Sequence, residues 1–280
     1  MLMSRLDNVF MVPPVLAYYG ALQEDPDTQW KYLNMAYQQI KAYREVLRDP
    51  DPAANGLWQH VAYGPWSDSG HWGEHVSLEC NHPFPVHPLP PNSRILLATG
   101  HGWAAAGILR VYQTIAKSPM RDSMEWALPD LCQWAEEIVG AVWAHQQPDG
   151  SLYNYLDQPD SFTDMSSTAF MAAVTYRLGL ITDATDHIGA ADKAFALVKE
   201  KIDGDGKLLD VVNPYEFSTP YDGVSPEGQA MVLMLQAAYR DYQNFGNHIN
   251  DSIAGVVSTR RFLEFLGFLR RGGGGKETRG

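Results

Sequence analysis

The stretch ATGHGWAAAGILRVYQTIAK at residues 98–117 combines side chains that do chemistry with residues that let a ligand come close. His101 and Trp103 each follow a glycine, so a proton-carrying imidazole and a flat indole ring lie beside bare backbone. Three alanines and Gly107 come next, and an apolar ladder with helical spacing follows: Ile108, Leu109, Tyr112 and Ile115. We expect a flexible, histidine-bearing segment that leads into a helix, with Thr99 or Gly100 near the helix start. The small-residue face of this helix could accept a ligand or another helix; the alternative is an ordinary buried helix with a glycine-rich entry.

Residues 73–97, GEHVSLECNHPFPVHPLPPNSRILL, hold three histidines and Cys80, which are side chains that bind zinc. Their spacing matches no zinc-finger or catalytic zinc motif, and five prolines make the segment too rigid to bring ligands together. We therefore expect no metal site and no cofactor. The lack of periodicity indicates an irregular insertion near a cavity mouth, whose deletion should leave folding intact.

Helical periodicity divides the rest of the chain into helix pairs. Residues 29–47 carry an amphipathic pattern, Pro13 and Pro14 disturb the helix before it, and Ser225 with Pro226 opens the last helix as its N-cap and first residue. The expected helices cover 7–22, 29–47, 102–117, 124–146, 164–178, 187–201 and 225–242, and a tail helix near 256–270 could add another.

A turn followed by a short extended piece recurs between the helix pairs. The three copies are NGLWQHV at 55–61, DGSLYNYL at 149–156 and DGKLLDVV at 205–212. Hairpins that cannot bury both faces alone must stack on their neighbours, in a solenoid or in a closed toroid. Aromatic, histidine and glycine residues at the hairpin mouths favour a toroid with a ligand cavity. We expect one all-α domain over 1–242 and a tail over 243–280 that is largely disordered or loosely helical.

The composition limits the partners of the protein. A net charge of −12 and a pI near 5.1 argue against binding to nucleic acids or to an anionic membrane surface. Two cysteines allow at most one disulfide. No apolar run reaches the roughly 20 residues of a membrane span. Asp7 and the prolines at 13 and 14 interrupt the apolar start, so we expect no signal peptide, and the localisation stays unknown.

Five short motifs occur in a fixed order: DNVFM at 7–11, GLWQH at 56–60, ATGHGWAAAG at 98–107, PDGSLYNYLDQPDS at 148–161 and SPEGQA at 225–230. In these motifs the chain resembles the unsaturated rhamnogalacturonyl hydrolases, glycoside hydrolase family 105, and the related unsaturated glucuronyl hydrolases of family 88. The resemblance implies an (α/α)6 toroid of six hairpins, present here as about seven or eight of twelve helices. It also implies an N-terminally truncated member with an insertion at 73–97.

The resemblance implies a hydrolase that acts on pectin-derived oligosaccharides ending in a 4,5-unsaturated uronic acid. In these families an aspartic acid protonates C4, water adds at C5, and the hemiketal collapses and releases the next sugar. By motif match Asp7 would be this acid, and His60 would bind the uronate carboxylate or the attacking water. Trp103 and Trp72 would stack on sugar rings.

Three further residues belong to the substrate-binding site that the resemblance implies. Thr99 and His101 lie in the ATGHGW motif, next to Trp103. Many members carry an arginine where this chain has Thr99, and that arginine would pair with the uronate carboxylate. Arg5, two residues before Asp7, could replace this missing cation.

Two other interpretations of the sequence stay open. One is a non-enzymatic homologue that binds sugars weakly or is inactive. The other is an (α/α)6 glycosidase with paired carboxylates, formed by Asp7 with Asp68 or Asp164.

An incomplete toroid should expose apolar side chains at its two open edges. The residues that we expect there are Phe10, Met11 and Tyr18 at one edge, and Met231, Leu233 and Leu235 at the other. Each such side chain loses roughly 1.5–3 kcal/mol of burial when it stays exposed. The sequence therefore predicts a marginal monomer that self-associates through these edges.

Overall fold

The computed structural model describes residues 4–62, 96–182 and 185–245. The chain divides into two compact units, Met1–Ala238 and Tyr239–Gly280. Within the second unit, the described residues 239–245 are helical, and Arg240 pairs with Asp241 at 3.0 Å. Among the helices that could be assessed in these ranges, none has the length and apolar character to cross a bilayer.

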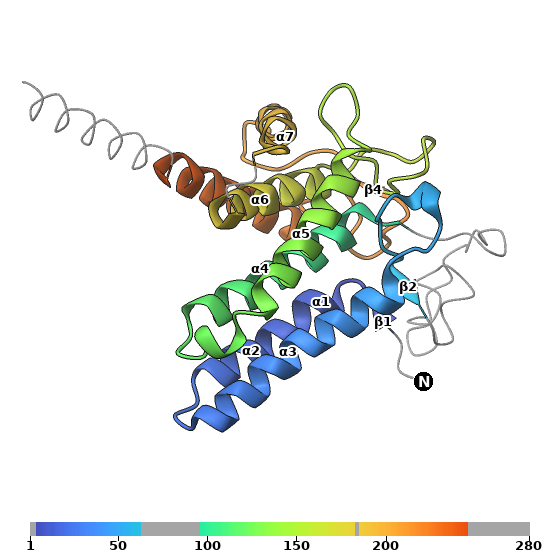
Figure 1. The fold of residues 1–280 in the computed structure, drawn as a ribbon. Helices are drawn as coiled ribbons and strands as arrows, with labels where there is room; N and C mark the ends of the chain where they lie inside the picture. Colours follow the sequence, from blue (N-terminus) through green and yellow to red (C-terminus); the bar gives the residue numbers. More distant parts are fainter. Residues whose placement is uncertain (1–3, 63–95, 183–184, 246–280) are drawn as a thin grey trace, which may run out of the picture. The chain divides into compact units, whose positions relative to one another are not determined.

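The first unit is built from helical hairpins (Figure 1). Helix α4 contacts α1, α2 and α6 as well as its own partner α5, so it lies at the centre of the array. The expected mostly helical hairpin architecture is confirmed. The hairpins pair α2 (Pro13–Ala21) with α3 (Pro26–Leu47), α4 (Ala98–Lys117) with α5 (Ala127–Trp143), and α6 (Met165–Thr182) with α7 (Ile188–Glu200). A further helix covers 226–245.

The first expected helix is in fact two helices. Helix α1 covers Asn8–Met11 and ends at Val12, where α2 begins with Pro13 as its first residue. Pro13 and Pro14 have no backbone N–H to continue the hydrogen-bond ladder of α1, but both fit the first turn of a new helix. The proline pair therefore separates the short helix that follows Asp7 from the longer α2.

Capping residues set the starts of two other helices. The Asp25 carboxylate accepts the Thr28 N–H at 2.9 Å and caps α3. Ser225 Oγ accepts the Gly228 N–H at 3.1 Å, which confirms the expected start of the helix over 226–245.

Helix α4 begins earlier than expected. Leu97 is its extended N-cap residue, and Gly100 and Gly102 lie inside its first turns, so the expectation of a flexible lead-in segment was wrong. The two glycines serve close packing instead. A Cβ at Gly100 would lie 2.9 Å from the Leu6 side chain, and one at Gly102 would lie 2.6 Å from the Phe170 ring.

Short extended pieces lie in the connections between successive hairpins, after α3, after α5 and after α7. Strand β1 (Ser4–Arg5) pairs antiparallel with β2 (Val61–Ala62), and β3 (Val211–Val212) pairs with β4 (Pro220–Tyr221). The three repeated turns adopt left-handed backbone conformations at Asn55 and Gly56, at Gly150 and at Gly206. One-turn 3-10 helices occur at Pro52–Ala54 and Asp122–Met124.

The proposed insertion ends earlier than its expected boundary at residue 97. Leu96 and Leu97 are buried, the Leu156 N–H donates to the Leu96 carbonyl at 3.0 Å, and Leu97 bridges to Tyr155. These two residues therefore belong to the packed fold. Residues 73–95, Trp72 and the expected tail helix near 256–270 lie outside the described residues.

Candidate functional site

The pairing of β1 with β2 brings Asp7 close to His60. Arg5 lies opposite Val61 in this pair, and the Leu6 N–H donates to the His60 carbonyl at 2.9 Å. Asp7 comes next in the chain, as the N-cap residue of α1. Its carboxylate makes no capping hydrogen bond to that helix, so its oxygens are directed to other partners.

The Arg5 guanidinium group binds both oxygens of the Asp7 carboxylate. The Arg5 Nε donates to Asp7 Oδ1 at 3.1 Å, and Nη2 donates to Oδ2 at 2.5 Å. The side chains of Arg5 and Asp7 remain 16% and 20% exposed. A two-pronged arginine–carboxylate contact fixes the orientation of the carboxylate, and its partial exposure leaves room for a ligand to reach both groups.

His60 is buried beside this ion pair. Its pKa is lowered to about 4, mainly by burial; the Asp7 charge opposes this shift, and the Arg5 charge adds to it. Its Nδ1 has no hydrogen-bond partner among the described residues, and a Cβ at Gly100 would lie 3.2 Å from this atom. At neutral pH His60 is therefore an uncharged imidazole with an unpaired ring nitrogen.

Trp103 connects the start of α4 to the last helix. Its ring meets Phe10 and Phe170 edge-on, with 4.6 Å between ring centroids in both pairs. The indole hydrogen-bonds to the Glu227 carboxylate. Burial raises the pKa of Glu227, and the charges of Asp164 and Asp7 raise it further, while the bond from Trp103 opposes this shift.

Sequence reasoning did not assign Glu227 or Tyr43 to the site. Glu227 lies in the SPEGQA motif, which we interpreted as a helix start and as one of the five motifs of the family resemblance, without giving Glu227 a role. Tyr43 belongs to the apolar pattern of α3, and its phenol shares a hydrogen bond with Asn8. Burial raises the pKa of Tyr43, and the Asp7 charge adds to this rise. Its helical spacing gave no signal of this contact.

His101 is part of the packing. The Trp58 N–H donates to its Nε2 at 2.9 Å, and its Nδ1–H donates to the Leu97 carbonyl at 2.7 Å. Both ring nitrogens are thus held by backbone groups, and the residue is fully buried. Thr99, two positions earlier, is also buried. The structure gives His101 a structural role, and we leave it out of the candidate site.

The carboxylate pairs of the alternative interpretation are not assembled around Asp7 in the described residues. Asp164 is fully buried and accepts backbone N–H groups from Ser166 at 3.0 Å, Ser167 at 2.9 Å and Val212 at 3.0 Å. It thereby caps α6 and anchors β3. Asp68, like Trp72, lies outside the described residues. The second carboxylate that interacts with Asp7 is Glu227.

Metal ligands are not grouped in the part of the chain that the structure describes. No set of three or more His, Cys, Asp or Glu side chains in these ranges could hold a metal ion.

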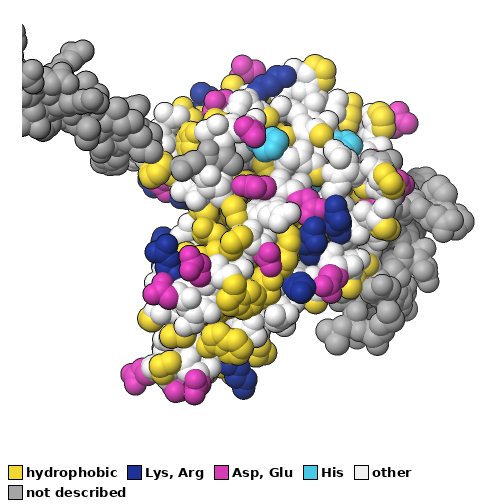
Figure 2. Space-filling view, in the orientation of Figure 1, with side chains coloured by type: hydrophobic (Ala, Val, Ile, Leu, Met, Phe, Trp, Pro, Cys, Tyr) yellow, Lys and Arg dark blue, Asp and Glu magenta, His cyan; other side chains and the backbone are white. Residues whose placement is uncertain are grey.

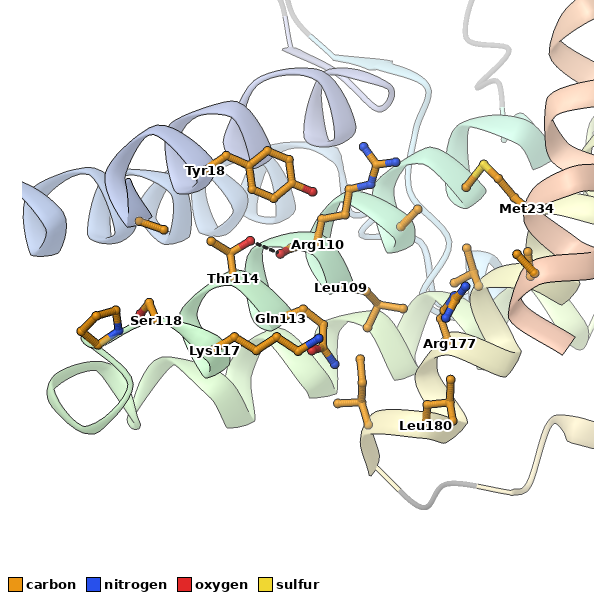
Figure 3. A pocket seen from close by; sticks show the side chains of 17 residues that line it. Tyr18, Leu109, Arg110, Gln113, Thr114, Lys117, Ser118, Arg177, Leu180 and Met234 are labelled. Carbon is orange, nitrogen blue, oxygen red and sulfur yellow. Dashed lines mark hydrogen bonds between the residues drawn. The ribbon is translucent and has the colours of Figure 1, made fainter. Parts of the chain in front are cut away.

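A cavity of about 870 Å³ lies apart from this site (Figure 3). Later turns of α4 line it with Arg110 and Lys117, and α6 contributes Arg177 and Leu180. No residue of the candidate site lines the cavity.

The chain matches the family model described as Glycosyl Hydrolase Family 88 over residues 90–243. The matched region contains Trp103 and Glu227, whereas Arg5, Asp7 and His60 precede it. Among curated proteins, none matches the chain.

Solved structures with similar folds include a possible member of the GH105 family from Salmonella enterica. It has 20% identity and a TM-score of 0.63, with 87% of this chain and 57% of that chain covered. A glycosyl hydrolase family 88 protein from Bacteroides vulgatus has 18% identity and a TM-score of 0.61, with coverages of 85% and 62%. An unsaturated glucuronyl hydrolase from Bacillus sp. GL1 has 17% identity and a TM-score of 0.57, with coverages of 85% and 58%.

These neighbours have the (α/α)6 toroid fold, and at such identities the likeness shows the fold alone. The chain spans about three fifths of the length of these structures. The expected fold class is confirmed for the part of the toroid that the chain contains.

Proposed function

The chain belongs to glycosyl hydrolase family 88, and from this premise we propose that it is a glycoside hydrolase of the unsaturated uronyl type. Its substrate would be a pectin-derived rhamnogalacturonan oligosaccharide with a 4,5-unsaturated uronic acid at the non-reducing end. The motifs DNVFM and ATGHGWAAAG support the unsaturated uronyl class, which the rhamnogalacturonyl and glucuronyl hydrolases share, and rhamnogalacturonan is our proposed substrate within that class. By the resemblance, Arg5 and Thr99 would lie near the uronate carboxylate.

The observation that carries the proposal is the convergence of Asp7 and His60 through the β1–β2 pair. Asp7 acts electrostatically on both His60 and Glu227, and Glu227 hydrogen-bonds Trp103. A carboxylic acid, a neutral imidazole, an indole and a second carboxylic acid are thus gathered from separate elements. This set can transfer a proton, orient water and contact a sugar ring.

Arg5 would change partners when substrate binds. In the free protein it holds Asp7, and an incoming uronate carboxylate offers the same two-pronged acceptor. Sharing Arg5 with the substrate weakens its hold on Asp7, the residue that we propose delivers the proton to C4. This exchange couples substrate binding to the orientation of the proposed general acid.

Asp7 and His60 would then act on the water. After protonation of C4, the Asp7 carboxylate can accept a proton from the water that adds at C5. The hemiketal formed at C5 opens, and the next sugar leaves. The unpaired Nδ1 of His60 could hydrogen-bond either this water or the uronate, because the imidazole is neutral at pH 7. Trp103 would contact the ring from α4.

A conventional glycosidase is the second candidate, and Glu227 is the observation that favours it. The raised pKa of Glu227 suits a general acid, and the ion-paired Asp7 would act as the base or nucleophile.

Two assays on the purified protein separate these candidates. An unsaturated uronyl hydrolase removes the ultraviolet absorbance of the conjugated double bond from an unsaturated rhamnogalacturonan disaccharide. A conventional glycosidase leaves this absorbance intact and hydrolyses the saturated substrate instead. Sugar binding without turnover of either substrate would favour the non-enzymatic homologue. An unsaturated glucuronyl disaccharide, compared in parallel, tests the rhamnogalacturonan assignment.

A further inference from the structure

Helices α1 and α2 carry an apolar stripe on their exposed side. Met11, Val15, Tyr18 and Leu22 are 48%, 62%, 44% and 81% exposed. Met11 ends α1, Val15 and Tyr18 lie three residues apart on one face of α2, and Leu22 is the C-cap residue of α2. Single apolar residues are common on protein surfaces, but a continuous row of this length indicates a contact surface. We call these four residues the α2 stripe.

The second edge at which we expected exposed apolar residues, on the helix over 226–245, does not carry a comparable row. Met231 and Leu235 are buried, so the expectation that they would be exposed was wrong. Leu233 is 71% exposed, but the apolar residues two positions before and after it, Met231 and Leu235, are buried. Phe10 is only partly exposed, because it packs against Trp103. Exposed apolar residues in a row are thus concentrated on α1 and α2.

The α2 stripe has charges of opposite sign at its two ends. At the Met11 end, the exposed Arg110 lies over the Phe10 ring at 4.0 Å from its centroid. No ion pair of Arg110 with a described carboxylate is present. At the Leu22 end, Glu24, Asp25 and Asp27 are exposed on the turn into α3. Asp25 caps α3, which leaves Glu24 and Asp27 to face outward.

The cavity adjoins the stripe and extends its apolar surface (Figure 3). Tyr18 and Ala21 of α2 line it together with Arg110 and Leu109 of α4. Figure 3 shows the Tyr18 ring and the Arg110 side chain near one another across the α2–α4 junction. In the space-filling view of one face, hydrophobic side chains likewise lie among charges of both signs (Figure 2). A partner on the stripe would therefore also meet Arg110.

We propose that the α2 stripe is the interface with a second copy of this chain, packed as an antiparallel pair of α2 helices across a two-fold axis. In such an interface every contact occurs twice, because a residue of one copy contacts a second residue of the other copy and the reverse contact is also made. A parallel pair would place Glu24 and Asp27 of both copies together, and like charges repel. In an antiparallel pair, Leu22 lies against the other copy's Met11, and Glu24 and Asp27 lie near its Arg110. Only this alignment brings opposite charges together at both ends.

Charge-reversal variants of the full chain test this interface by sedimentation velocity. Arg110→Glu alone and the double variant Glu24→Lys with Asp27→Lys should each weaken the homodimer by roughly tenfold or more, because each reverses both end contacts. An equimolar mixture of the two should dimerise, since the side chains that meet at each end of the mixed dimer again have opposite charges. Lys41→Glu, at an exposed site on α3, is the matched control and should dimerise like wild type.

A second variant checks the apolar part of the surface. Val15→Asp changes an exposed residue, so the fold should persist by circular dichroism while the dimer dissociates. The proposal is overturned by a wild-type chain that stays monomeric at high concentration, or by a mixture of the charge variants that stays monomeric. Homodimers of either charge variant with wild-type affinity would also overturn it. None of these measurements depends on the proposed enzymatic activity.

Discussion

Arg5 and Asp7 form a two-pronged ion pair within three residues of chain, with Arg5 Nε 3.1 Å from Asp7 Oδ1. The pair lies directly before α1, at the register where β1 meets β2. The pair therefore joins Asp7, the candidate acid, to Arg5, the cation that we propose binds the substrate carboxylate. The proposed mechanism requires Arg5 to bind both Asp7 and the substrate.

Replacing Arg5 should alter discrimination between charged and uncharged substrates. We expect Arg5→Gln to lower kcat/KM for the uronate substrate by about 10–100-fold, the equivalent of one charge-assisted contact. The methyl ester of the same substrate cannot accept the two-pronged contact as a carboxylate does. The ratio of kcat/KM for acid over ester should therefore fall towards one in Arg5→Gln.

Two controls accompany the Arg5 measurement. Arg5→Lys keeps the charge but loses the fork, so its ratio should lie between those of wild type and Arg5→Gln. Arg121→Gln, at an exposed position, should leave the ratio unchanged. An unchanged acid-to-ester ratio in Arg5→Gln would remove Arg5 from substrate binding.

Replacing Asp7 should remove the chemical step. An asparagine has the same shape but cannot deliver a proton to C4, so Asp7→Asn should lower kcat by about 100-fold or more. Circular dichroism should show unchanged helix content, since Asp7 makes no capping bond to α1. The exposed Asp186→Asn is the matched control. If Asp7→Asn kept more than a few per cent of wild-type activity, Asp7 would not be the acid.

Local sequence signals predicted the helices well. Periodicity placed α3, α5, α6 and α7, and the Ser-Pro pair at 225 placed the start of the last helix. These features depend on residues within one or two turns of each other. From the proline pair we expected one disturbed helix over 7–22. The structure has two helices that meet at Val12.

Features that depend on distant contacts could not be predicted in the same way. Gly100 and Gly102 suggested flexibility, but each accommodates a side chain from another element, Leu6 and Phe170. We assigned His101 to the substrate-binding site from its motif. Its ring nitrogens instead hydrogen-bond to the backbone of Trp58 and Leu97, and these partners cannot be identified from the sequence. The bond from Trp103 to Glu227 joins residues from different hairpins, and their separation in sequence hides it.

Two buried imidazoles predict acid sensitivity. Burial lowers the pKa of both His60 and His101 to about 4, against an ordinary value near 6.5. Between these values the unfolded chain binds more protons than the folded chain, so stability falls as the pH drops from about 6.5 to about 4. Below about 4 both states are protonated, and this contribution changes no further.

Variants isolate the contribution of each imidazole. Each histidine adds at most one proton to the slope, which is about 1.4 kcal/mol per pH unit. His60→Gln should therefore reduce the slope of unfolding free energy against pH, measured by urea titration from pH 4 to 7. His101→Gln should reduce it likewise, although its backbone bonds make it the more destabilising change at neutral pH. Parallel curves for wild type and both variants would contradict the assigned shifts.

The contact between α1 and α4 predicts that Gly107 controls the position of Asp7. A Cβ at Gly107 would lie 2.3 Å from the Val9 carbonyl oxygen and 2.8 Å from Phe10 Cα, which are backbone atoms of α1. Backbone cannot rotate away as a side chain can, so Gly107→Ala must push α1 off α4. We expect a loss of about 1–3 kcal/mol in unfolding free energy, as for other overpacked cores.

The same displacement should reach the site, because Asp7 is the N-cap of α1 and Phe10 packs on Trp103. We therefore expect Gly107→Ala to lower kcat even at temperatures where the variant stays folded. Gly189→Ala is the matched control: it lies in α7 with nothing within 4 Å of the added Cβ, so it should raise stability by up to about 1 kcal/mol and leave kcat unchanged. Urea midpoints and kcat for both variants decide the question. Equal effects of the two substitutions would show that the close approach of α1 to α4 does not position Asp7.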